Sequence, residues 1–385
     1  MFKIKKIAYL SKMAYSDVDL SFLHEMQKIA DVTYFLLVDS YSLCSCAIDI
    51  RGYKLKEGLH NALEYEPLKR FAHIIDMDKF YVFYSPARHA YERKSFLFNY
   101  KLYKILKKFD VVHTTIVPSA LNIFMPLLRN KFVLTVHDPI PHSSATYRAD
   151  SINRKITFNY IKNIILLNKN QKEEFINYYG ISTKTQIYNS ALSCYTYLQI
   201  YNDSLYSVKK PYILYFGNIV SYKGLDYLFP AMKKVHELFP DLRLIIAGKG
   251  RFYFDIEEYK KLDYFQIENR FIPDNELADM IRNCEFTVVP YIDATQSGVI
   301  MSAYAFNKPC VATNVGGLPE MVNDGKNGII VKPKNVEALA DAICKLHCSQ
   351  EKIKEFSNVI KEEYSEGLKS WKYIATQIKE IYEKI

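Results

Sequence analysis

Short apolar runs alternate along this chain with polar loops and amphipathic segments. The clearest case is the apolar run 286–290, which precedes the polar loop Asp293–Gly298 and a helix-like segment beginning near Val299. A second apolar run, Cys310–Thr313, leads into the turn Gly316–Gly317. Buried strands that alternate with helices indicate a parallel α/β sheet, and such sheets bind ligands beyond the carboxyl ends of their strands. The pattern therefore predicts a ligand site in these two loops, although ordinary turns of an α/β sheet show the same letters.

The same alternation continues through the rest of the chain. Apolar runs predict strands at residues 6–10, 32–38, 110–114, 132–136, 164–167, 186–188, 212–216 and 244–247. Apolar residues at helical spacing predict helices at residues 18–30, 91–109, 119–128, 170–179, 225–239 and 365–385. Residues 40–80 mix apolar and charged positions and favour no assignment, and the polar residues 204–211 are typical of a linker.

Two loops in the second half carry groups that suit an anion. Gly217–Gly224 joins an apolar run to a helix and holds Lys223, while Ser297 stands directly before a predicted helix. First-turn amides of a helix have no acceptor within the helix, and the helix dipole favours negative charge there. A cation and such amides suit a phosphate group, so the two loops resemble a site for a phosphate and a sugar. The pair Gly248 and Gly250 is only a weak dinucleotide fingerprint, because Tyr253 stands at the third glycine position.

Several segments then carry a family resemblance. They are FGNIVSYKGLDYLFPAM at 216–232, LIIAGKG at 244–250, FIPDNELADMIRNCEFTVVPY at 271–291 and the alternating stretch 290–331. In order and spacing they resemble the donor-binding half of retaining GT-B glycosyltransferases of family 4, most specifically over residues 211–345. The resemblance implies an α/β chain with two Rossmann-like domains facing each other across a cleft and a C-terminal helix crossing back to the first domain. It implies domains at 1–205 and 206–365, with the returning helix at 366–385.

The resemblance also implies how the donor is held. In the family an Arg and a Lys of the loop after the first strand brace the diphosphate; here the Lys is Lys223, but the Arg position holds Asn218. The family's Glu-x7-Glu pair falls on Ala294 and Ser302, so both carboxylates are missing, and Asp293 is the neighbouring carboxylate that can substitute. The expected donor-binding residues are Gly217, Asn218, Lys223, Pro273, Glu276, Asp293, Gln296, Ser297, Gly298, Val299, Ser302 and Glu320.

Residues 271–277 resemble the loop and capped helix that hold the nucleotide base in the family. Pro273 and Glu276 are the residues expected to take part. Ordinary capping of a helix by Asp274 explains the same letters, so the base-binding role rests on the resemblance alone.

The acceptor side is predicted in the first half of the chain. His113 and the pair His137 and Asp138 stand at the ends of predicted strands, and residues 137–142 resemble a segment that lines the cleft in the family. We expect His137 and Asp138 to act with Lys223 as catalytic residues, and His113 and His142 to lie on the acceptor side. A structural role for a histidine at a strand end stays open. The resemblance implies no metal ion and no cofactor. The nucleotide sugar is the expected co-substrate.

Charge is divided unequally between the two halves. Residues 1–200 carry 27 Lys and Arg against 17 Asp and Glu, whereas residues 201–385 carry 24 against 25. In the first half, the predicted helix at 91–109 holds Lys101, Lys104 and Lys108 along one face. A basic amphipathic helix suits an anionic membrane surface, and it equally suits the solvated outer layer of a Rossmann-like domain. No nucleic-acid partner is expected.

Targeting features favour a cytoplasmic protein. No apolar run approaches the roughly 18 residues that a membrane span needs, and the N-terminal residues lack the pattern of a signal peptide. The seven cysteines form no C-x-x-C pair and are typical of reduced thiols in a cytosolic protein. We expect a cytoplasmic protein, either free or peripheral on the inner face of the plasma membrane.

The leading interpretation is a retaining hexosyltransferase. It would move a hexose from a UDP- or GDP-linked sugar to a glycan or lipid-linked saccharide in bacterial surface polysaccharide synthesis. One alternative is a GT-B enzyme that acts on nucleotide sugars alone, such as a 2-epimerase. Another is a non-catalytic basic binding protein, and the missing Arg and Glu residues leave room for an inactive homologue.

Overall fold

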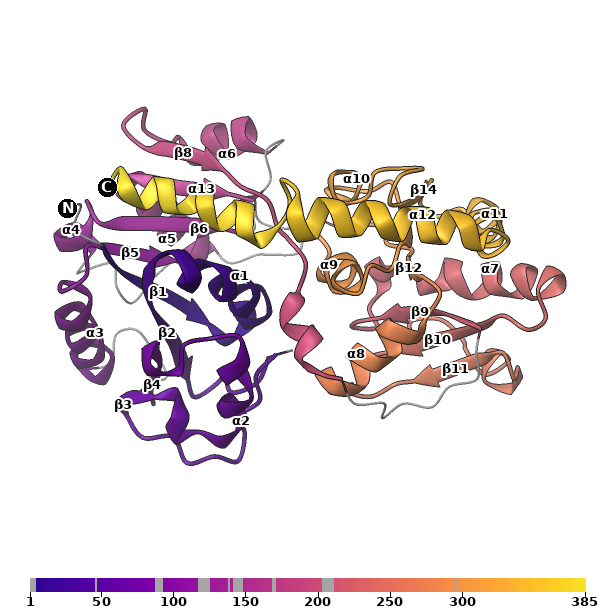
Figure 1. The fold of residues 1–385 in the computed structure, drawn as a ribbon, viewed down its shortest axis with the longest axis horizontal. Coiled ribbons are helices and arrows are strands. Elements are labelled where there is room, and N and C mark those ends of the chain that lie inside the picture. The colour runs from indigo at the N-terminus through magenta and orange to yellow at the C-terminus, as the bar shows by residue number, and fades with distance from the viewer. Residues whose placement is uncertain are drawn as a thin grey trace. The chain divides into compact units, whose positions relative to one another are not determined.

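Two compact units make up the chain (Figure 1). The computed structural model describes residues 5–45, 47–86, 93–116, 125–137, 139–140, 148–167, 171–202, 211–294 and 296–385. Unit 1 contains Met1–Leu192 and Trp371–Ile385, and unit 2 contains Ser193–Ser370. All of the expected linker at 204–211 except its last residue lies outside the described residues.

The described residues of unit 1 form an eight-stranded sheet in the order β3-β4-β2-β1-β5-β6-β7-β8. Neighbouring strands run parallel except the edge strand β3, which is antiparallel to β4. The strands are β1 Lys6–Lys12, β2 Asp31–Asp39, β3 Gly58–Asn61, β4 Phe80–Ser85, β5 Val111–Thr114, β6 Phe132–Val136, β7 Asn163–Leu166 and β8 Gln186–Asn189. The strand order reverses between β1 and β5, because the chain adds β2 on one side of β1 and β6 on the far side of β5.

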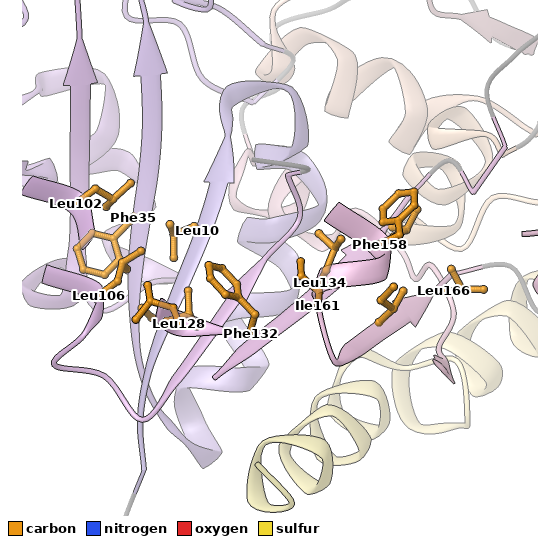
Figure 2. Packing of buried hydrophobic residues seen from close by; sticks show 14 of the residues in the cluster. Leu10, Phe35, Leu102, Leu106, Leu128, Phe132, Leu134, Phe158, Ile161 and Leu166 are labelled. Carbon is orange, nitrogen blue, oxygen red and sulfur yellow. The ribbon is translucent and has the colours of Figure 1, made fainter. Parts of the chain in front are cut away.

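Helices pack on this sheet through apolar side chains. The helices of unit 1 are α1 Ser16–Ile29, α2 Glu66–Lys69, α3 Arg93–Leu106, α4 Met125–Leu128, α5 Arg148–Tyr160, α6 Lys172–Tyr179 and α13 Trp371–Glu383. Figure 2 shows Leu102 and Leu106 of α3 and Phe158 of α5 gathered with strand residues such as Phe132 and Leu134 in one buried cluster. Burying such a side chain completely stabilises the fold by about 1.5–3 kcal/mol, so this cluster anchors α3 and α5 to the sheet.

The C-terminal helix α13 belongs to unit 1, where it packs on α1. The ring of Trp371 lies 5.8 Å from that of Phe22 on α1. Further along α13, the hydroxyl of Tyr382 is hydrogen-bonded to Nδ1 of His113, at 2.5 Å. Lys5 Nζ donates to the carbonyl oxygen of Tyr382 at 3.0 Å and to that of Glu383 at 3.2 Å, which satisfies carbonyls at the helix end. The expected return of this helix to the first domain is confirmed.

The described residues of unit 2 form a six-stranded, wholly parallel sheet in the order β11-β10-β9-β12-β13-β14. The strands are β9 Tyr212–Phe216, β10 Arg243–Ala247, β11 Phe265–Glu268, β12 Thr287–Val289, β13 Cys310–Thr313 and β14 Gly328–Val331. Their helices are α7 Leu225–Leu238, α8 Asp274–Asn283, α9 Gly298–Ala305, α10 Leu318–Met321, α11 Val336–His347 and α12 Gln350–Lys361. The strand order reverses between β9 and β12, and parallel sheets bind ligands at such a switch point.

Several elements differ from the sequence-based predictions. Residues 40–80, which favoured no assignment, contain β3 and α2, and the predicted helix 119–128 is described only as α4, because residues 117–124 lie outside the described residues. The predicted helix 365–385 is shorter, because Gly367 separates a π-helical turn at Glu362–Glu366 from α13. No helix of the described residues is long and apolar enough to cross a membrane.

Candidate functional site

The loops that follow β9 and β12 meet at the switch point of unit 2. The first loop ends at Gly224, whose φ is +68°, and a Cβ placed there would lie 1.9 Å from the carbonyl oxygen of Pro290. Ile292 N donates to the carbonyl oxygen of Tyr222 at 2.8 Å, which ties the two loops together. Only glycine allows this close approach at a left-handed position, so the contact places Lys223 beside the β12 loop.

Lys223 is a half-buried cation held between aromatic rings. Its Nζ lies 3.6 Å from the centroid of the Tyr291 ring and 5.2 Å from that of Tyr222. Burial lowers the pKa of Lys223 to about 7. Within the described part of the chain, no carboxylate forms an ion pair with it. A desolvated ammonium without a counter-ion is a ready partner for an anionic ligand, because the ligand's charge offsets the cost of burial.

The first turn of α9 lies at the end of the second loop. Ser297 is its N-cap, and its Oγ accepts from the amide of Ile300 at 3.4 Å. The amide of Ser297 itself donates to Sδ of Met321 at 3.3 Å, so this amide is already occupied. The next two amides, of Gly298 and Val299, are those that a helix leaves without an acceptor of its own. Of the expected donor-binding residues Ser297, Gly298 and Val299, the last two therefore have first-turn amides that the helix itself does not pair.

A third loop, after β13, closes on the second. Gly316 has a φ of +49°, and a Cβ there would lie 1.5 Å from the carbonyl oxygen of Ala294. Gly317 N donates to the same oxygen at 3.3 Å. Glu320 and Asp293, one in α10 and one beside Ala294, have exposed side chains. The glycine pair noted in the sequence thus holds two loops together through backbone contact.

The positions of the missing family residues differ in exposure. Ala294 and Ser302 are 7% and 6% exposed, and neither offers a carboxylate. Asn218 is exposed, and Gln296 is half-buried. Gly217 has a φ of +116° and lies at the end of β9. The site therefore contains fewer charged groups than the family resemblance implies.

The expected base-binding residues lie at the start of α8. Pro273 is the N-cap residue and is exposed, while the carboxylate of Glu276 forms an ion pair with Arg270. Arg270 also pairs with Glu268 at 3.1 Å. The side chain of Glu276 is thus held in place by a neighbouring cation, and its oxygens are partly used.

The acceptor-side histidines lie in unit 1. His113 is 1% exposed, and its Nε2 is hydrogen-bonded to Oγ1 of Thr135 at 2.7 Å. Burial and the neighbouring His137 lower the pKa of His113 to about 3, so its ring is neutral. The ring of His137 is stacked on that of Tyr15, with centroids 4.4 Å apart. Both histidines line one pocket, together with Thr115, Ser190 and Trp371. Asp138 and His142 lie outside the described residues.

The aromatic rings around Lys223 were not predicted from the sequence. Tyr291 comes from a segment about 70 residues away in the chain, so only the pairing of β9 with β12 brings its ring under the ammonium. The local sequence Tyr222-Lys223 was the one available signal. The described residues contain no group of three or more His, Cys, Asp or Glu side chains arranged to hold a metal ion.

Comparison with known proteins finds a family match in the second half of the chain. The family described as "Glycosyl transferases group 1" matches residues 210–349, which include all the loops of unit 2 described above. Residues 210–349 of this chain are therefore similar to the group 1 glycosyl transferases. Members of this family transfer a sugar from a nucleotide sugar.

Curated relatives agree with this assignment. An uncharacterized glycosyltransferase of Methanocaldococcus jannaschii is 28% identical over 67% of this chain and 71% of its own length. The alpha-D-kanosaminyltransferase of Streptomyces kanamyceticus is 29% identical over 36% of each chain. The phosphatidyl-myo-inositol mannosyltransferase of Mycobacterium leprae is 28% identical over 42% of this chain and 43% of its own. The chain thus matches less than half the length of the last two relatives.

Solved structures extend the likeness to the whole chain. Sucrose-phosphate synthase of Thermosynechococcus elongatus has a TM-score of 0.65 at 17% identity and covers 98% of this chain and 99% of its own. Anabaena HepE in complex with UDP has a TM-score of 0.67 at 16% identity and covers 99% of this chain and 100% of its own. HepE has also been solved with UDP-glucose. The chain therefore has the GT-B fold, with two Rossmann-like parallel sheets and a C-terminal helix on α1.

Proposed function

We propose that this protein is a retaining, metal-independent hexosyltransferase that takes its sugar from a UDP- or GDP-linked donor. The acceptor would be a glycan or a lipid-linked saccharide in the synthesis of a bacterial surface polysaccharide. The observation that carries the proposal is the cation Lys223 at the switch point of unit 2, for which the described residues provide no carboxylate partner. The match of residues 210–349 to the group 1 glycosyl transferases supports it.

Lys223 would bind the diphosphate of the donor. As the bond to the sugar breaks, negative charge grows on the leaving diphosphate, and a preorganised cation and amide dipoles lower the energy of that state. Backbone hydrogen bonds tie the Lys223 loop to the β12 loop, the Lys223 ammonium lies over the Tyr291 ring, and Ser297 caps α9, so little reorganisation is needed. A bound diphosphate favours the charged ammonium and would raise the pKa of Lys223 from about 7.

The remaining donor-site residues would position the sugar and the nucleoside. We assign the hydroxyl groups of the hexose to Asp293, Glu320 and the polar side chains of Gln296 and Ser302. Asp293 and Glu320 are exposed and flank the loop pair Ala294–Gly317, which supports this assignment. The base would lie against the backbone around Pro273 and beside Glu276, whose carboxylate is held by Arg270.

On the acceptor side, His137 would orient the incoming hydroxyl together with Asp138 and His142, and His113 would support it from the core. In a retaining transfer the donor phosphate itself can accept the proton of the acceptor, so no side-chain base is required. The pocket that His137 shares with Thr115 and Ser190 supports a positioning role. The stack on Tyr15 holds the imidazole ring in one orientation.

We further propose that unit 1 docks on an anionic membrane through α3. Lys101 and Lys104 are exposed on this helix, and Lys108 is exposed just after its end. The exposed apolar side chains of the same helix are Phe96, Leu97 and Tyr100, with 51%, 48% and 40% of their surface accessible. Basic groups next to exposed apolar side chains are the composition of a helix that lies in a membrane interface.

A panel of UDP- and GDP-sugars, with and without a lipid-linked saccharide, tests the proposed function. We expect nucleotide release from one donor, increased by the acceptor and abolished in Lys223→Ala. Conversion of the donor to an epimer without any acceptor would instead support a nucleotide-sugar 2-epimerase. No turnover of any donor, combined with salt-dependent binding to a polyanion, would support the non-catalytic binding protein.

A further inference from the structure

The neighbour of Asn218 on the adjacent strand is a lysine. β9 and β10 pair in parallel with Phe216 opposite Ala247. The pairing continues past the strands, because Gly217 N donates to the carbonyl oxygen of Ala247 at 3.0 Å and Ile219 N donates to that of Lys249 at 3.1 Å. An isolated parallel bridge pairs Ile219 with Gly250. The register therefore places Lys249 directly opposite Asn218.

Paired residues of parallel strands direct their side chains to the same face of a sheet. Asn218 and Lys249 are both exposed, whereas Ile219 is 1% exposed and faces the other way. A Cβ at Gly250 would lie 2.8 Å from Cβ of Ile219, so the residues at 219 and 250 occupy the opposite face. Neighbouring strands lie about 4.8 Å apart, a gap that the four-carbon side chain of lysine spans easily.

Lys249 is also an uncommitted cation. Within the described residues its ammonium enters no ion pair or side-chain hydrogen bond, unlike Arg270 and Lys233 in the same unit. The carbonyl oxygen of Lys249 accepts a hydrogen bond from Ile219 N, in the loop that leads to Lys223. Within this loop, Lys223 lies against Tyr291 of the β12 loop, whereas Asn218 lies beside Lys249 of the β10 loop.

We propose that Lys249 supplies the second cation of the diphosphate site and replaces, from the neighbouring strand, the charge that Asn218 does not carry. This inference rests on the proposed function, because it assigns a further residue to the same donor site. Lys249 binds the phosphate oxygens as a flexible point charge, whereas Lys223 is held in place by the Tyr291 ring. The site then contains two cations, although only one stands at a position the family resemblance identifies.

Calorimetric titration of the full chain with UDP, GDP and uridine tests the inference. Lys249→Met should weaken binding of whichever diphosphate the wild type prefers by about 10-fold, because a charge-assisted hydrogen bond is lost. Binding of the nucleoside should not change, since it carries no phosphate. Lys249→Arg should retain most of the affinity. Adding an arginine at the neighbouring position, in Asn218→Arg with Lys249→Met, should restore diphosphate binding.

The matched control is Lys332→Met. Lys332 is an exposed lysine that follows the carboxyl end of β14, four strands away from β10 in the same sheet, and its removal should leave all affinities unchanged. Unchanged diphosphate binding by Lys249→Met, or an equal loss for nucleoside and diphosphate, would overturn the role of Lys249 while the proposed function stands. Failure of the wild type to bind either diphosphate would overturn the proposed function and this inference together.

Discussion

The switch points of the two sheets are built from similar strands but are filled differently. In unit 1 the boundary between β1 and β5 is covered by the chain's own C-terminal helix, whose Tyr382 is hydrogen-bonded to His113 of β5. In unit 2 the boundary between β9 and β12 leads to loops that hold Lys223 between tyrosine rings. At the first switch point His113 is hydrogen-bonded within the chain, whereas at the second Lys223 presents a cation with no carboxylate partner among the described residues.

The buried ionisable groups follow the same division. In unit 1 the fully buried carboxyl of Asp19 accepts hydrogen bonds from the hydroxyls of Tyr9 and Ser11. His113 is likewise hydrogen-bonded at both ring nitrogens. In unit 2 the main contacts of the Lys223 ammonium are aromatic faces, which stabilise a cation by only about 0.5–2 kcal/mol. Both sheets reverse their strand order at one point, so the difference indicates that the side chains at a switch point, and not the reversal itself, decide whether it suits an anion.

The largest expected effect comes from removing the Lys223 ammonium of unit 2. Lys223→Ala should lower sugar transfer by about 100- to 1,000-fold, which is the usual cost of losing a donor to developing negative charge. Affinity for the nucleoside diphosphate should fall as well. The melting temperature of the ligand-free protein should change little, because Lys223 makes no ion pair among the described residues. Normal turnover by this variant would contradict the role of Lys223, and with it the functional difference between the two switch points.

The second prediction concerns the exposed lysines on and just after α3 in unit 1. Changing Lys101, Lys104 and Lys108 to Glu should abolish salt-sensitive binding to anionic vesicles, since each near-surface lysine contributes about 1 kcal/mol. Donor hydrolysis should remain intact. The matched control changes the exposed lysines Lys345, Lys354 and Lys361 of unit 2 to Glu, which should leave vesicle sedimentation unaltered. Equal binding by both triple variants would show that α3 is simply a solvated helix.

A smaller loss is expected on the acceptor side. His137→Ala should reduce transfer to the acceptor by about 100-fold through lost positioning. Slow hydrolysis of the donor by water should persist, because the diphosphate-binding loops of unit 2 are untouched. Steady-state kinetics with and without acceptor separate the two activities. Unchanged kinetics would assign His137 a structural role, in its stack on Tyr15.

The last prediction concerns stability and not activity, through the buried carboxyl of Asp19 in unit 1. Burial raises the pKa of Asp19 from 3.8 to about 8, so the folded protein keeps a proton that the unfolded chain loses above pH 4. The free energy of unfolding should therefore fall between about pH 4 and pH 8, by up to about 1.4 kcal/mol per pH unit from this group. Asp19→Asn should flatten that slope in denaturant titrations. An identical slope in both proteins would contradict the raised pKa.

The elements that could be predicted from the sequence are those whose burial pattern is visible within one short segment. β1, β9, β12 and β13 are short apolar runs with both faces buried, so their letters alone identify them. The edge strand β3 was missed because its residues are only half-buried and its pattern is weak. α5 was missed because exposed Ile152 and Ile156 break the separation of apolar and polar faces.

The candidate site was predicted only in part, for a similar reason. The loop position of Lys223 could be read from Gly217–Gly224, which is local. Its contact with Tyr291, and the contact of Gly316 with Ala294, depend on which loops the sheet order brings together. The occupied amide of Ser297 depends on Met321, which is distant in sequence. Such contacts require the topology and cannot be read from one segment.

A crystal structure of the protein with the nucleoside diphosphate of its donor tests the central claim most directly. The account predicts phosphate oxygens within about 3 Å of Lys223 Nζ and facing the amides of Gly298 and Val299 at the start of α9. Phosphates bound away from both the β9 loop and the β12 loop would contradict it.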